Sequence, residues 1–117
     1  ITFEELAERI WRIENFLNRY ISGPRQEELI ELYENRLTAY YKGLPNTPIA
    51  AYDSGEILEN VYESYESTAA NDGYVTSSMI GEYRIAIRDN DMIVDDGILA
   101  LADQYIDESV RVLTEFK

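Results

Sequence analysis

The residues of this chain whose types and spacing best suit a binding role are four glutamates. Glu56, Glu59, Glu63 and Glu66 recur three, four and three residues apart, which places them on one face of a helix. Like charges at these intervals destabilise a helix by about 0.2–0.5 kcal/mol per pair, so this face would gain from a basic partner, bound cations or high salt. An ordinary solvated helix face is the alternative, because penalties of this size are tolerated.

A second acidic stretch, with Asp89, Asp91, Asp95 and Asp96, offers the carboxylate oxygens that Ca²⁺ prefers. It does not match an EF-hand loop, because Ile93 and the following valine stand where that loop has an acidic or amide side chain and a glycine. We therefore expect a solvated loop followed by a helix N-cap, with neither a metal site nor a cofactor.

Histidine and cysteine are both absent from the 117 residues. Their absence removes Ser-His-Asp and thiolate catalysis, disulfides, iron–sulfur clusters and imidazole ligands for a metal. The scattered glycines form no phosphate-binding loop, and no motif selects a pair of carboxylates for hydrolysis. We expect that the protein is not an enzyme.

The chain carries 23 acidic against 10 basic residues, a formal net charge of −13. Nucleic-acid and anionic-membrane binding depend on basic residues, so we expect neither, and no apolar run is long enough to insert into a membrane. The charge favours a basic protein partner, cations or simple solubility, in the cytoplasm or in a virion. Eight arginines but only two lysines accompany the acidic excess, a pattern expected of proteins in high salt, so a halophilic source is one hypothesis.

Ten tyrosines are many for a chain of this length. Amphipathic aromatic residues are enriched at protein interfaces. Tyr41, Tyr52, Tyr62 and Tyr74 are expected to be exposed, and Tyr41, Tyr62 and Trp11, with the four glutamates, are the residues we expect to contact a partner. Five other tyrosines fall on apolar stripes and are expected in the core: Tyr33, Tyr40, Tyr65, Tyr83 and Tyr105.

The elements that position these residues are helices. Apolar spacing predicts helices over 2–22, 25–43 and 96–116, the first with a Thr2–Glu5 capping box. Ser22-Gly23-Pro24 is expected to end the first helix, and this short link predicts that the first two helices form an antiparallel hairpin.

Two further segments leave alternatives open. Segment 48–69 is expected to be helical, starting either at residue 48 or near residue 54. Segment 74–94 fits a helix, but residues 83–88 alternate like a strand that would pair with 92–94. The helix is favoured because an isolated two-stranded ribbon is marginally stable.

Together these elements predict an all-α fold, a compact bundle of four to five helices forming a single domain over 1–117. We expect a non-catalytic structural or adaptor subunit that acts through protein–protein contacts, as a homo-oligomer or in a larger assembly such as a viral particle. One alternative is a small acidic inhibitor or immunity-type protein that binds a basic partner. Another is a helical ligand-sensing domain of a receptor.

Overall fold

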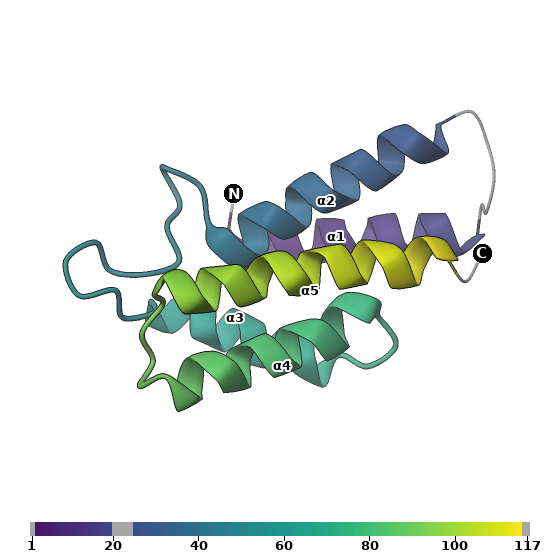
Figure 1. Ribbon diagram of the computed structural model, residues 1–117. Helices are drawn as coiled ribbons and strands as arrows, with labels where there is room; N and C mark the ends of the chain where they lie inside the picture. Colours follow the sequence, from purple (N-terminus) through teal and green to yellow (C-terminus); the bar gives the residue numbers. More distant parts are fainter. Residues whose placement is uncertain (1, 20–24, 116–117) are drawn as a thin grey trace.

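The computed structural model describes residues 2–19 and 25–115. Within these ranges the chain forms five α-helices: α1 (Phe3–Arg19), α2 (Gln26–Lys42), α3 (Glu59–Ala70), α4 (Val75–Asp89) and α5 (Asp96–Glu115). The helices lie along one another in an elongated bundle of 45 × 26 × 23 Å, and α1 and α2 pack together as an antiparallel hairpin (Figure 1). The predicted all-α bundle and its first hairpin are confirmed.

Helix α1 follows the apolar spacing of its sequence. The hydroxyl Oγ1 of Thr2 accepts a hydrogen bond from the backbone N–H of Glu5 at 3.1 Å, which is one of the two hydrogen bonds of the predicted capping box. The predicted stop at 22–24 lies outside the described residues, as does Tyr20. The buried residues of α1 include five that recur three or four positions apart: Phe3, Leu6, Ile10, Ile13 and Leu17.

The predicted helix 48–69 is wrong in its first half, because residues 43–58 form a loop and α3 begins only at Glu59. Two prolines interrupt this stretch, and backbone hydrogen bonds between loop residues replace helical ones. The backbone N–H of Ala51, for example, donates to the carbonyl oxygen of Glu56 at 2.8 Å. The loop projects from one end of the bundle (Figure 1).

The helical prediction for segment 74–94 is confirmed over Val75–Asp89, which form α4, and is wrong for residues 90–94; residues 83–88 do not form the alternative strand. After α4 the chain turns through Asp91 and Met92, whose φ angles of 58° and 64° lie in the left-handed region that side chains disfavour. Ile93 then pairs with Glu56 of the preceding loop as an isolated bridge. The turn is therefore joined to loop 43–58.

Asp95 caps the N-terminus of α5, as predicted for the acidic stretch. Its Oδ1 accepts from the backbone N–H of Ile98 at 3.0 Å, and its Oδ2 accepts from the side-chain amide of Asn90 at 3.1 Å. These hydrogen bonds favour the carboxylate and lower the pKa of Asp95.

The core of the bundle is rich in tyrosine. Ring centroids lie 5.1 Å apart for Tyr40 and Tyr65, and 4.8 Å apart for Tyr41 and Tyr83. The expectation that Tyr41 is exposed is wrong, because this residue is buried against Tyr83 and Tyr105. The tyrosines with an exposed fraction of 0% are Tyr33, Tyr40, Tyr41, Tyr65 and Tyr83.

Hydroxyl groups of these tyrosines cap the C-terminal end of α2. The Tyr65 hydroxyl donates to the carbonyl oxygen of Tyr40 at 2.5 Å, and the Tyr83 hydroxyl donates to that of Tyr41 at 3.0 Å. The last carbonyls of a helix lack partners within the helix, so α3 and α4 supply them here. Burial raises the pKa of both hydroxyls.

A buried carboxylate on α1 caps α4 in the same way. Oε1 of Glu14 accepts from the backbone N–H of Val75 at 2.8 Å, and Oε2 accepts from the N–H of Thr76 at 2.9 Å. The hydroxyls of Tyr33 and Thr76 also donate to Oε2, at 2.9 Å and 2.5 Å. Glu14 is fully buried and forms no salt bridge within the described ranges, where its hydrogen-bond partners are these backbone and hydroxyl donors of α2 and α4.

Candidate functional site

The four glutamates singled out in the sequence meet at one hollow on the protein surface. Its volume is about 420 Å³, and it lies along α3 where loop 43–58 and the turn after α4 come together. We call it the acidic groove. Its lining residues are Glu56, Ile57, Glu59, Tyr62, Glu63, Glu66 and Met92.

The acidic rim of this groove is not neutralised within the molecule. Glu59, Glu63 and Glu66 project from α3 and Glu56 comes from the loop, and all four residues are exposed. Across residues 2–19 and 25–115, none of the four carboxylates pairs with a basic side chain or accepts a hydrogen bond. The groove therefore presents several negative charges that are free to meet a cation.

The floor of the acidic groove is apolar and is held in place by backbone hydrogen bonds. Ile57 is buried, while Tyr62 and Met92 are partly buried and pack against the core. The N–H of Ile57 donates to the carbonyl oxygen of Met92 at 2.8 Å, and the N–H of Val94 donates to that of Gly55 at 2.8 Å. These bonds bring Met92 to the glutamates, a contact that no sequence pattern indicated.

Carboxylates around an apolar floor suit a particular kind of ligand. An arginine or lysine side chain can lay its methylene stem on apolar surface while its charged end meets carboxylates. A guanidinium group can also stack on an aromatic ring such as that of Tyr62. Among the described residues, no three carboxylates are grouped so that they could hold a metal ion.

Trp11 and Tyr41, which were also predicted to contact a partner, lie elsewhere. Trp11 stacks on Tyr74 with ring centroids 5.5 Å apart and lines a smaller hollow of about 170 Å³ between α1 and α3. Tyr41 is buried in the core and offers no surface. Tyr52 is fully exposed on loop 43–58, as expected. Of the three aromatic residues predicted to contact a partner, Tyr62 lies with the four glutamates, whereas Trp11 and Tyr41 do not.

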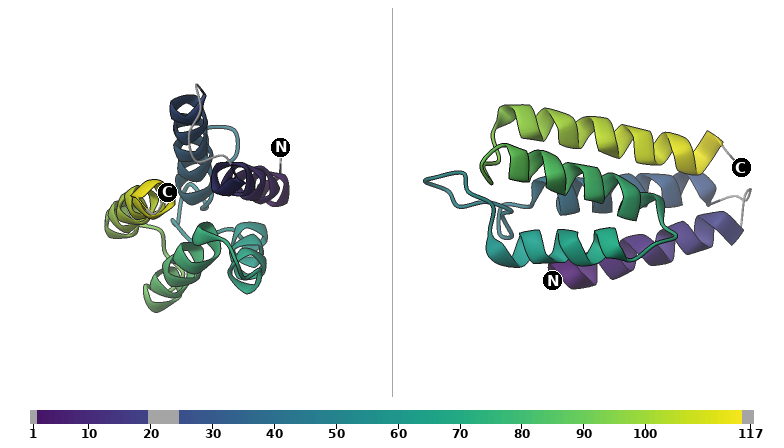
Figure 2. Two further views of the ribbon diagram at one scale, coloured as in Figure 1. Left: turned by 90° about the vertical axis from the view of Figure 1, so that its right-hand side faces the viewer. Right: turned by 90° about the horizontal axis from the view of Figure 1, so that it is seen from below.

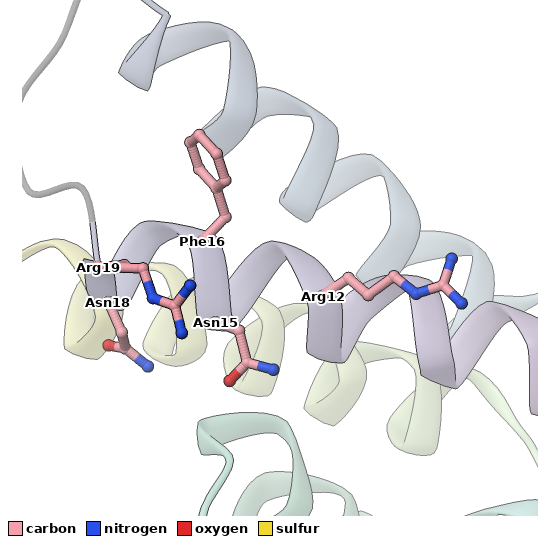
Figure 3. A pocket seen from close by; sticks show the side chains of 5 residues that line it. All are labelled: Arg12, Asn15, Phe16, Asn18 and Arg19. Carbon is pink, nitrogen blue, oxygen red and sulfur yellow. The ribbon is translucent and has the colours of Figure 1, made fainter.

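A second surface hollow, of about 690 Å³, is lined, among the described residues, by side chains of α1 (Figure 3). Arg12 and Arg19 are exposed there, and neither forms a salt bridge within the described part of the chain. We call these two arginines the arginine face. The arginine face could have been predicted from the sequence, because residues seven positions apart share one face of a helix. The remaining lining residues are Asn15, Phe16 and Asn18.

A comparison with protein-family models, with curated proteins and with solved structures found no match to this chain. None of the described helices is long and apolar enough to cross a membrane. What the protein does must therefore be inferred from the chemistry of its surfaces.

Proposed function

We propose that this protein is a non-catalytic helical subunit that acts through protein–protein contacts in an assembly, with the acidic groove as the surface that binds a basic segment of a partner. One observation carries the proposal: four carboxylates that have no ion-pair partner among the described residues surround one hollow whose floor is apolar. Charge of one sign steers a partner of the other sign, and the apolar floor adds contact area that salt does not screen.

The acidic inhibitor remains a second candidate, because the same groove and the net charge of −13 would suit a basic enzyme surface. An inhibitor of this kind would be monomeric alone, and its binding would be lost as salt rises. The sensor-domain alternative has less support, because the acidic groove and the α1 hollow both lie open on the surface.

Neutralising the groove should weaken binding of a basic helix. The probe is an alanine-based helical peptide with two arginines seven residues apart, titrated by calorimetry. We expect the Glu59→Gln, Glu63→Gln, Glu66→Gln triple variant to bind at least about tenfold more weakly than the unmodified protein, since each charge-assisted hydrogen bond contributes about 1.5–3 kcal/mol. Folding stability should be unchanged or slightly higher, because repulsion along α3 is relieved.

The matched control changes the same charge at the same spacing elsewhere. Glu27, Glu31 and Glu34 are exposed on α2 at the same intervals, so neutralising all three alters the net charge equally. We expect this control to keep peptide affinity within about twofold. If peptide affinity fell equally in both triple variants, binding would depend only on net charge. That result would contradict the acidic groove as the binding surface.

Met92 is expected to contribute more to peptide binding in the acidic groove than to the stability of the fold. A Met92→Gly substitution removes a side chain from the groove floor, and glycine adopts the left-handed φ of 64° without penalty. We expect peptide affinity to fall several-fold while the free energy of unfolding stays within about 1 kcal/mol, because relief of backbone strain offsets lost packing. A calorimetric titration beside urea unfolding checks both. Unchanged peptide affinity would contradict a role for Met92 in binding.

A further inference from the structure

We propose that the basic segment bound by the acidic groove is helix α1 of a second copy of this chain, through its arginine face. The inference rests on the proposed function and adds the identity of the partner. Arg12 and Arg19 would meet the carboxylates of Glu59 and Glu66, and the Tyr62 ring would lie beneath the arginine stems. Such a contact would be an assembly contact between identical subunits.

The two surfaces match in spacing as well as in charge. Arg12 and Arg19 are seven residues apart on α1, and Glu59 and Glu66 are seven residues apart on α3. At 1.5 Å per residue, both pairs span about 10.5 Å, and seven residues are close to two turns, so each pair lies on one face of its helix. Two ion pairs can therefore form together when the helices lie alongside one another.

One molecule presents both the acidic groove and the arginine face, but the two surfaces do not form ion pairs with each other within that molecule. Arg12 and Arg19 are exposed and form no salt bridge within the described ranges, and the same is true of the groove carboxylates. In a chain with a net charge of −13, two exposed arginines on one helix face, without an ion pair to any described residue, form a local basic site. The arginine face of one copy can therefore supply the positive charges that the acidic groove of another copy lacks among its described neighbours.

Their positions favour contact between molecules rather than within one. The acidic groove lies where α3 begins, whereas α1 extends past α3 toward the other end of the bundle (Figures 1 and 2). A contact between two different surfaces of identical subunits is heterologous, so a bound pair still has one free groove on one copy and one free arginine face on the other. Repetition of the contact gives a closed ring or an open chain.

Two complementary variants test this pairing. The first is the groove variant with Glu59, Glu63 and Glu66 changed to Gln, and the second is Arg12→Gln with Arg19→Gln. Light scattering should show that the unmodified protein increases in mass with concentration, while each variant alone stays at the monomer mass of 13.5 kDa. An equimolar mixture should give a one-to-one complex of about twice that mass and nothing larger, because only one functional groove meets one functional arginine face.

Two controls separate this contact from general charge effects. The triple change at Glu27, Glu31 and Glu34, and an Arg9→Gln change on α1, should associate like the unmodified protein, since these residues line neither surface. The pairing is overturned if the two variants fail to bind each other, if the Arg12/Arg19 variant associates normally, or if the unmodified protein remains monomeric. If the pairing is overturned but the unmodified protein still binds the arginine peptide, the acidic groove remains a binding surface and its partner is a different protein. If the unmodified protein does not bind the peptide, the proposed function of the groove is itself contradicted.

Discussion

Raising the pH above about 10 should unfold this protein in one cooperative step, and the ultraviolet absorbance of ionised tyrosine should rise in the same step. Five tyrosines are completely buried in the core. Because phenolate is poorly stabilised away from water, burial raises the pKa of each of these hydroxyls in the folded protein: Tyr33, Tyr40, Tyr41, Tyr65 and Tyr83.

The sign of the pH dependence follows from these raised pKa values. A folded-state pKa above the unfolded value of about 10 means that the folded protein holds its protons more tightly, so this stabilisation is fully present below pH 10 and is lost as pH rises toward the folded pKa. A tyrosine whose folded pKa lies well above the solution pH contributes about 1.4 kcal/mol per pH unit, or about 5–6 kcal/mol per unit for the four with the largest rise, Tyr33, Tyr41, Tyr65 and Tyr83. Domains are commonly stable by about 5–15 kcal/mol, so about one to three pH units should suffice for unfolding.

The measurement is a pH titration followed at once by phenolate absorbance and by far-ultraviolet circular dichroism. A Tyr83→Phe variant should reduce the cooperative absorbance step, whereas Tyr52→Phe should leave it unchanged, because Tyr52 lies fully exposed on a loop. Ionisation of all the tyrosines near pH 10 while the helical signal persists would contradict the packing of this core.

The second large effect is expected at the buried carboxylate. A Glu14→Ala substitution should lower the free energy of unfolding by about 3 kcal/mol or more, because it removes the acceptor of the Val75 and Thr76 N–H groups, and because only one of the Tyr33 and Thr76 hydroxyls, 3.1 Å apart, can donate to the other. A Glu14→Gln variant keeps the shape and one carbonyl acceptor, so its loss should be smaller, about 1–2 kcal/mol.

Urea unfolding of both variants beside Glu8→Ala provides the comparison. Glu8 is exposed on the same helix, so its replacement should change stability by no more than about 0.5 kcal/mol. If Glu14→Ala lowered the free energy of unfolding as little as Glu8→Ala, the hydrogen bonds from α4 to Glu14 would not stabilise the packing of α1 and α4.

Much of the groove was predictable because most of its acidic residues share one helix. Glu59, Glu63 and Glu66 recur at helical spacing, and that spacing fixes a common face without knowledge of the rest of the fold. Met92 was not predictable, because its place in the groove depends on a backbone hydrogen bond to Ile57 across a long stretch of chain. Local periodicity carries no information about such a contact.

The burial of Tyr41 was missed for a related reason. Tyr40 and Tyr41 are neighbours in the sequence and leave α2 in different directions, so a single apolar stripe includes only one of them. Helix α2 packs against both α1 and α5, which buries two of its faces. Glu14 did carry a usable signal, because it lies four residues after Ile10 and within the buried stripe of α1.

The most direct measurement of assembly through the acidic groove is the native mass of the unmodified protein, by light scattering over a range of concentrations at low and at high salt. We predict a mass that rises above 13.5 kDa with concentration at low salt and falls as salt screens the arginine–glutamate pairs. A mass of 13.5 kDa at every concentration and salt level would contradict assembly of copies through the acidic groove and the arginine face.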